Sequence, residues 1–92
     1  MIVRYSPAAR GDLAGIHTFV WTESKSQEIA DRFLSRLLAA SDELATLPSR
    51  YPVYSNRRGT RMMPFENYII FYKVVRDEVR VQRVRHAARR PL

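Results

Sequence analysis

Residues 60–90 decide the fold, and they read TRMMPFENYIIFYKVVRDEVRVQRVRHAARR. The segments 68–75 and 78–86 are rich in Val, Ile, Tyr and Phe and flank the polar pair Arg76-Asp77, a pattern typical of a β-hairpin. Arg-Asp lacks the glycine that the tightest hairpin turns prefer, so we expect a slightly longer loop. The segment 68–75 is apolar on both faces except for Lys73, which favours a central strand covered by helices on one face.

The last strand has an irregular apolar pattern. Val79 and Val81 share one face under the period of two, whereas Val84 falls on the other. A β-bulge near Gln82-Arg83 would return Val84 to the first face. Without a bulge, the strand is apolar on different faces at its two ends.

Two amphipathic helices precede this stretch. Ser6 is a favourable N-cap and Pro7 suits the first helical position. Apolar residues then recur at helical spacing over residues 13–20 and, over five turns, over residues 30–45. Leu47-Pro48 ends the second helix.

Two details of these helices are less regular. Gly11 and Gly15 weaken the first helix by about 1 kcal/mol each relative to Ala, and a close approach by a neighbouring helix is the simplest compensation. The second helix starts either at Ser24, with Gln27 completing a capping box, or at Ser26 before an acidic first turn.

The order of predicted elements is β-α-α-β-β-β. Residues 2–5 form the first strand, residues 49–59 are loop by composition, and residues 60–63 form a strand that turns at 64–66. The fold class is α+β, with a helical hairpin packed on one face of a small, mostly antiparallel sheet. The predicted core consists of Leu13, Ile16, Val20, Phe33, Leu37, Leu38, Leu44, Tyr68, Ile70, Tyr72 and Val74.

The composition fits one small domain. With 92 residues, 46% of them apolar, the chain can build one core, and we expect a single domain over residues 1–92. There is no cysteine, which excludes a disulfide framework and a thiolate metal site. The sequence shows no apolar signal region and no stretch near the roughly 18 apolar residues of a membrane span. We therefore expect a cytoplasmic protein with no membrane partner.

Positive charge is concentrated in the second half of the chain. The net charge is +7, with five basic and six acidic residues in 1–47 against eleven basic and three acidic residues in 48–92. Fourteen of the sixteen cations are arginine, which favours bidentate recognition of carboxylate or phosphate groups. A nucleic acid, a nucleoprotein or an acidic protein would each suit this charge, and a solvated basic surface is the alternative.

Catalytic and metal chemistry find little support in the residues. Two histidines without cysteine make a metal site unfavourable, and the sequence has no glycine-rich phosphate loop or nucleophile elbow, so no cofactor is expected. Arg61, Glu66, Tyr72 and His86 lie on neighbouring strands and would suit RNA cleavage if they converged. However, the period of two places Tyr72 on the core face, and Glu66 sits in a turn. We therefore predict no catalytic residues.

Several segments in this order resemble the RelE/ParE toxin superfamily, and the ParE branch is the closer match. They are SPAA at 6–9, GTR at 59–61, NYIIFYKV at 67–74 and VRHAARR at 84–90. The resemblance spans nearly the whole chain. It implies a toxin of a type II toxin–antitoxin pair, a small domain held inactive by a cognate antitoxin that is acidic and partly disordered alone.

The two branches of that superfamily differ in activity. RelE-type members are ribosome-dependent mRNA endonucleases with an arginine at the position of Ile69, lysines near Thr60 and Met62, and a late arginine near Ala87. The residues present here cannot hold or activate a scissile phosphate. ParE-type toxins poison DNA gyrase without being nucleases, so the resemblance implies a non-enzymatic gyrase inhibitor. A ribosome-dependent endonuclease is the alternative, and a basic nucleic-acid-binding module ranks last because no recognition-helix pattern is present.

The resemblance also assigns two interaction surfaces. We expect the antitoxin, through an amphipathic helix and an extended piece, to cover an apolar strip on the open face of the sheet, made of Ile69, Phe71 and Val75 and flanked by Lys73 and Arg80. Homodimerisation through this strip is the alternative. We expect gyrase, rather than a specific DNA sequence, to contact Arg57, Arg58, Arg61, Arg83, Arg85, His86, Arg89 and Arg90. The tail 87–92 should be mobile alone, and a higher toxin–antitoxin oligomer is left open.

Overall fold

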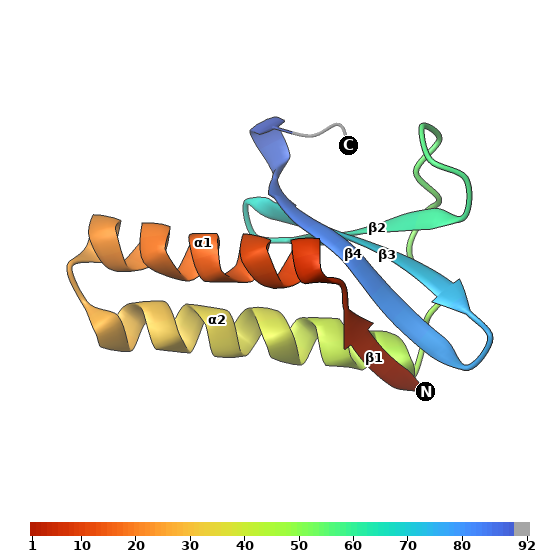
Figure 1. Cartoon of the computed structure of the whole chain (residues 1–92), viewed down its shortest axis with the longest axis horizontal. Coiled ribbons are helices and arrows are strands. Elements are labelled where there is room, and N and C mark those ends of the chain that lie inside the picture. The colour runs from red at the N-terminus through yellow and green to blue at the C-terminus, as the bar shows by residue number, and fades with distance from the viewer. Residues whose placement is uncertain (90–92) are drawn as a thin grey trace.

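A computed structural model describes residues 1–89 of the chain. Its elements are β1 (Ile2–Tyr5), α1 (Pro7–Ser24), α2 (Gln27–Asp42), the 3-10 turn η1 (Glu43–Ala45), β2 (Thr60–Phe65), β3 (Tyr68–Val75), β4 (Glu78–His86) and the 3-10 turn η2 (Ala87–Arg89). The predicted order β-α-α-β-β-β and the α+β class are confirmed. In Figure 1 the two antiparallel helices form one layer against the sheet, and their connecting end extends beyond it.

The sheet has four strands in the order β1-β4-β3-β2. The strand β3 pairs antiparallel with both β2 and β4 and is the middle strand of a three-stranded meander. The first strand, β1, pairs with β4 in parallel, because the helical hairpin carries the chain across one face before it returns. The sheet is therefore mixed, with a central β3–β4 pair.

Local sequence signals set the helix starts. The Ser6 hydroxyl accepts a hydrogen bond from the Ala9 N–H at 3.0 Å, as its N-cap position predicts. The N-cap of α2 is Ser26, whose hydroxyl accepts from the Ile29 N–H at 3.2 Å. The alternative start at Ser24 is wrong, because that residue ends α1 and donates to the Val20 carbonyl.

A β-bulge lies in β4, which is the first of the two alternatives left open by its apolar pattern. The pairing shifts between Phe71, opposite Arg83, and Tyr72, opposite Val81, so that Gln82 is the extra residue. The bulge brings Val84 back to the face of Val81, and both are buried. Apolar burial along both halves of β4 therefore requires the bulge.

Two turns differ from expectation. Arg76-Asp77 is a two-residue turn and not a longer loop, because Arg76 adopts the left-handed conformation that glycine would favour, with φ of 56°. The strand β2 extends through Pro64 to Phe65, so the turn lies at Glu66-Asn67 rather than at 64–66. Proline is tolerated there because Pro64 pairs with β3 on one side of β2 and lies beyond the bridge that Arg61 forms on the other side.

The core lies between the helical hairpin and the face of β3 that carries Tyr68, Ile70 and Tyr72. All predicted core residues belong to it. Those buried are Leu13, Ile16, Leu37, Leu44, Tyr68, Ile70 and Tyr72, while Val20, Phe33, Leu38 and Val74 are partly buried against them. The same face of β4 adds Val79, Val81 and Val84.

Replacing Leu37 with Ala should lower the free energy of unfolding by about 2–5 kcal/mol, because Leu37 is fully buried in α2 against the sheet. Leu47→Ala is the matched control, since Leu47 is 58% exposed and its truncation should change the stability by less than about 0.5 kcal/mol. Urea denaturation of both variants measures the difference. Equal midpoints would show that this core assignment is wrong.

Candidate functional site

The open face of the sheet is not the exposed apolar strip that the sequence predicts. Phe71 is 0% exposed, because the Tyr54 ring packs edge-on against it with 5.2 Å between the ring centroids. Ile69, Lys73 and Val75 on the same face of β3 are half-buried. The prediction of an exposed Phe71 is therefore wrong.

Residues 47–59, which we call the strap, provide this cover. The strap runs beside β2: Val53 forms a β-bridge with Arg61, and the Met62 N–H donates to the Pro52 carbonyl at 3.0 Å. The Tyr54 N–H donates to the Thr60 carbonyl at 2.6 Å. Composition indicates a loop here, and the pairing with β2 was missed because it depends on the tertiary register and not on local propensity.

Two paired residues of the sheet, Arg61 of β2 and Tyr72 of β3, hold the strap through hydrogen bonds to its carbonyls. The Arg61 guanidinium donates to the Tyr51 carbonyl at 2.7 Å, and the Tyr72 hydroxyl donates to the Pro48 carbonyl at 2.6 Å. Burial raises the pKa of Tyr72, so the hydroxyl keeps the proton that it donates. Both side chains are therefore engaged in structural contacts.

Glu66 and His86 are the other two residues considered for RNA cleavage, and they contact different parts of the chain from Arg61 and Tyr72. Glu66 forms an ion pair with Arg36 of α2. The His86 ring lies edge-on to Tyr68, with 5.4 Å between the centroids, and its Nδ1 accepts from the Ala88 N–H at 3.2 Å. The four residues do not converge on a common point.

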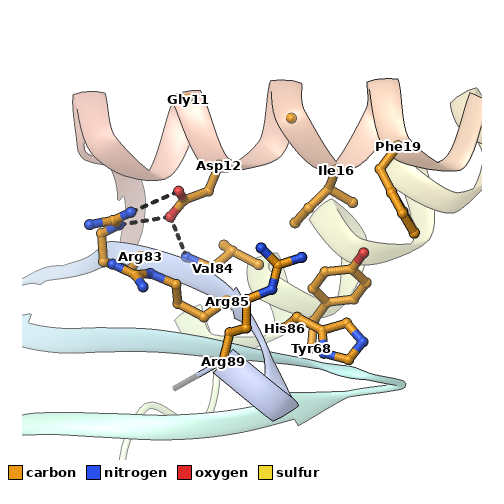
Figure 2. A pocket seen from close by; sticks show the side chains of 11 residues that line it. Gly11, Asp12, Ile16, Phe19, Tyr68, Arg83, Val84, Arg85, His86 and Arg89 are labelled. Carbon is orange, nitrogen blue, oxygen red and sulfur yellow. Dashed lines mark hydrogen bonds and ion pairs between the residues drawn. The ribbon is translucent and has the colours of Figure 1, made fainter. Parts of the chain in front are cut away.

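A groove does form on the helix side of the molecule, between α1 and the end of β4. This α1–β4 groove has a volume of about 420 Å³, within the range of roughly 300–1,000 Å³ typical of ligand pockets. Figure 2 shows Ile16 and Phe19 reaching down from α1 and the Arg89 guanidinium lying between Val84 and Tyr68, while the Arg85 side chain runs along β4 toward Arg83. A Cβ added at Gly11 or Gly15 would meet no heavy atom of its surroundings within 4 Å, so the expected compensation by a neighbouring helix is wrong. The lining residues of the groove are Gly11, Asp12, Gly15, Ile16, Phe19, Tyr68, Arg83, Val84, Arg85, His86 and Arg89.

The groove exists because β1 is short. β1 pairs with β4 only as far as Val81, so the later part of β4 has a strand neighbour on the β3 side only. The start of α1 satisfies this edge instead: the Ser6 hydroxyl donates to the Gln82 carbonyl at 2.8 Å, and the Asp12 carboxylate accepts from the Val84 N–H at 2.9 Å. The helix therefore lies along the edge without filling the space of a strand.

Asp12 also forms a bidentate ion pair with Arg83, with N–O distances of 2.8 and 3.0 Å (Figure 2). Burial alone raises the pKa of Asp12, but the hydrogen bonds from Arg83 and the Val84 N–H and the charges of Arg83 and Arg85 outweigh it and hold the pKa below its ordinary value. No local pattern marks Asp12 as a structural residue, because its partners lie 71 and 72 residues away.

The predicted target-contact residues fall into separate regions. Arg83, Arg85, His86 and Arg89 line the α1–β4 groove. Arg57 and Arg58 are exposed in the strap. Arg61 of β2, in contrast, donates hydrogen bonds to strap carbonyls. Arg90 lies outside the described residues. The neighbouring residues Ala87–Arg89, expected to be mobile, form η2, and the Ala87 N–H donates to the Asn67 carbonyl at 2.7 Å.

Among the predicted antitoxin contacts, Lys73, Val75 and Arg80 line a pocket of about 320 Å³ on the open face, together with Arg4. Glu78 joins the two arginines there: it accepts from Arg4 at 2.7 Å and from Arg80 at 3.0 Å. No cluster of three or more His, Asp or Glu side chains within residues 1–89 could hold a metal ion. Neither α1 nor α2 is long and apolar enough to span a membrane.

Two solved structures with a similar fold come from toxin–antitoxin systems. A chain of the "Chromosomal ParDE TA system from P. aeruginosa" matches with a TM-score of 0.82 and 17% identity, over 94% of this chain and 95% of that one. A chain of the toxin–antitoxin complex RelBE2 from Mycobacterium tuberculosis matches with a TM-score of 0.67 and 23% identity, over 92% and 95%. At these identities the likeness concerns the fold, and the fold class is that of RelE/ParE-like proteins.

The sequence itself then gives the family. The profile described as "ParE toxin of type II toxin-antitoxin system, parDE" matches residues 3–91, and the chain belongs to this family. A search of curated proteins finds no match.

The Asp12 contacts generate a pH-dependent prediction. Asp12→Ala should lower the free energy of unfolding at neutral pH by about 1–3 kcal/mol, because it leaves the Val84 N–H and the Arg83 guanidinium without their acceptor. Since the folded-state pKa of Asp12 is lowered, this contribution is present above the ordinary pKa of 3.8 and is lost as the pH falls below it toward the folded-state value.

Urea denaturation of wild type and Asp12→Ala at pH 7 and pH 2.5 measures this. The difference between the two proteins should be large at pH 7 and should shrink at pH 2.5. A difference that is independent of pH would contradict an ionised Asp12 as the source of the stability.

Proposed function

We propose that this ParE-family toxin inhibits DNA gyrase in the cytoplasm through protein contacts, without catalysing a reaction, and is neutralised by a cognate acidic antitoxin. The observation that carries the non-enzymatic part is the engagement of Arg61 and Tyr72 with the strap. A general base, a general acid and a phosphate-holding cation must converge on the scissile bond to cleave RNA. Here Arg61 and Tyr72 bind carbonyls of the strap, and Arg83 binds the Asp12 carboxylate.

The gyrase part is supported by family membership and by the distribution of charge. Arg57 and Arg58 are exposed at one end of the sheet, and Arg89 is exposed in η2 at the other. In Figure 1 the strap and η2 rise on the same side of the molecule, with the sheet between them. Two separated basic ends suit an acidic protein groove, or the DNA that gyrase holds.

An antitoxin partner is supported by the family description and by the likeness to a chain from a solved toxin–antitoxin complex. On the open face, the basic pocket of Arg4, Lys73, Val75 and Arg80 would suit an extended acidic piece of that antitoxin. Half-buried Ile69 lies toward the other end of β3 from this pocket, and Phe71 between them is already covered by Tyr54.

The purified chain should block supercoiling by DNA gyrase and leave gyrase covalently attached to cut DNA. Deleting residues 87–92 should abolish the inhibition with little change in melting temperature, since the described part of this segment buries no core residue. A relaxed-plasmid supercoiling assay and a covalent-complex assay measure these effects. Arg10→Glu is the charge control, because Arg10 is exposed on α1 outside the groove.

Full inhibition by the truncated chain would show that the C-terminal residues are dispensable. No effect of the intact chain on gyrase would contradict the proposed target. Duplex DNA binding by the chain alone, falling steeply with salt, would instead favour a nucleic-acid-binding module.

The chain should not cleave mRNA on a programmed ribosome, because Ile69 stands where RNA-cleaving relatives have an arginine and Arg61 is held by the strap. Primer extension on translated mRNA, with and without the chain, detects such cuts. Cuts that disappear in His86→Gln would contradict the non-enzymatic proposal and favour the endonuclease alternative.

A further inference from the structure

We propose that three cations in a row across the open face of the sheet, Arg4, Arg80 and Lys73, bind the phosphodiester backbone of the DNA that gyrase holds. We call these three residues the cation row. This inference rests on the proposed function in taking gyrase with its bound DNA as the target. It names the chemical group that this basic surface recognises in that complex.

The register of three adjacent strands builds the cation row. Arg4 of β1 pairs with Arg80 of β4, and Lys73 of β3 pairs with the same Arg80. Paired residues project to the same face of a sheet, and Val79 and Val81 on either side of Arg80 are buried in the core, so the row faces away from the helices. Strands lie about 4.8 Å apart, so the row spans roughly 10 Å, the length of about three nucleotides of one DNA strand.

The positive charge of the row is only partly neutralised by the described residues. Like charges on directly paired residues repel each other, so this register costs stability. Glu78 accepts a hydrogen bond from the Arg4 Nε at 2.7 Å and one from the Arg80 Nε at 3.0 Å. Lys73 has no ion-pair partner among residues 1–89, and the lining of the pocket beside the row contains no carboxylate. The row therefore holds three positive charges against one negative charge.

Glu78 orients the two arginines and leaves them able to bind a further anion. Both of its hydrogen bonds use Nε, so the terminal nitrogens of the two guanidinium groups are not taken up by this carboxylate. The side chains of Arg4 and Arg80 are 62% and 53% exposed, so a ligand can reach them. Phosphate oxygens accept such N–H donors in charge-assisted hydrogen bonds.

The stem of Lys73 is packed against the strap. A Cβ added at Gly59 would come within 3.1 Å of the Lys73 Cε, so the lysine side chain lies directly over this glycine. The packed stem brings the ammonium group to the turn of the strap in which Arg57 and Arg58 are exposed. The cation row therefore continues toward two further exposed cations at the β2 side of the sheet.

The surroundings of the row favour phosphates over an acidic protein segment. Protein interfaces are anchored by large apolar and aromatic side chains that fill pockets. The one aromatic residue in the lining of the pocket beside the row, Tyr5, packs against the core, and Phe71 further along the sheet is covered by Tyr54. A positively charged surface without an accessible apolar anchor is typical of protein–DNA interfaces. Phosphate contacts carry no base sequence information, so they suit a target that gyrase, and not a DNA sequence, defines.

The row adds affinity only where gyrase already fixes the DNA. Contacts to phosphates alone give non-specific binding with a Kd of roughly 10⁻⁴–10⁻⁶ M at physiological salt. In the complex with gyrase, the row is the second contact of a toxin that already binds the protein, which raises its effective concentration at the DNA. The acidic antitoxin piece proposed for the same pocket would take the place of the phosphates, so the two ligands exclude each other.

The test measures the affinity of the full chain for gyrase alone and for gyrase bound to a duplex DNA fragment, at several salt concentrations. Lys73→Gln and Arg80→Gln each remove one charge of the row. Arg10→Gln is the matched control, because Arg10 is exposed on α1, outside the row and its pocket. The melting temperature of each free variant and its affinity for the same duplex without gyrase are measured in parallel.

DNA should raise the affinity of gyrase for the wild-type chain. Lys73→Gln and Arg80→Gln should each weaken binding to gyrase with DNA at least about fivefold and bind gyrase alone within about twofold of wild type. Each should also reduce the slope of log affinity against log salt by about 1. Their melting temperatures should be unchanged or higher, because each removes a repulsion between paired cations. Arg10→Gln should behave as the wild-type chain in every measurement.

Row variants that bind gyrase with DNA as tightly as the wild-type chain would overturn the inference and leave the proposed function standing. An equal loss of affinity with and without DNA would assign the row to an acidic protein surface and would also overturn the inference. A wild-type chain that binds gyrase in neither form would contradict the proposed target, and the inference with it. Tight binding of the free chain to the duplex alone would favour a nucleic-acid-binding module over both.

Discussion

The carboxylate of Asp12 is the contact on which the arrangement of helices and sheet depends. A four-residue β1 leaves the outer edge of the later part of β4 without a strand neighbour, and an unpaired strand edge is open to association with other chains. The Asp12 carboxylate accepts hydrogen bonds from the Val84 N–H and from the Arg83 guanidinium, so it binds a backbone group and a side chain of this edge. Because these bonds tie α1 to β4 from the side, the helix protects the edge and still leaves a groove beside it.

The bulge at Gln82 connects this edge to the rest of the sheet. By adding one residue, it keeps Val79, Val81 and Val84 on the core face. The Gln82 side-chain oxygen accepts a hydrogen bond from the buried Thr60 hydroxyl at 2.8 Å, so the bulge residue also contacts the first residue of β2. A feature that looks like a fault in the strand pattern thus satisfies a polar group that β2 would otherwise bury alone.

Sequence reasoning predicted what local chemistry determines. The hairpin, the Ser6 cap and the core follow from periodicity and from single residue types, and the structure contains each of them. The period of two left the bulge as one of two alternatives, and the register of β3 with β4 decides for it. The strap and the Asp12 contacts were not predicted, because both depend on residues distant in sequence. Tyr54 covers Phe71 only because residues 52–54 pair with β2, and period-2 reasoning cannot tell a covered face from an open one.

The arginine count alone therefore gives a poor map of an interaction surface. Arg61 holds strap carbonyls, Arg83 holds Asp12, and Arg36 pairs with Glu66 while stacking on Phe33, so these charges stabilise the fold. Arg85 differs because its guanidinium is partly desolvated in the groove without a complete set of acceptors. Desolvation without pairing costs free energy that a partner can recover. Within the described residues, Arg85 therefore differs from Arg36, Arg61 and Arg83, because its buried Nε costs free energy in the folded chain.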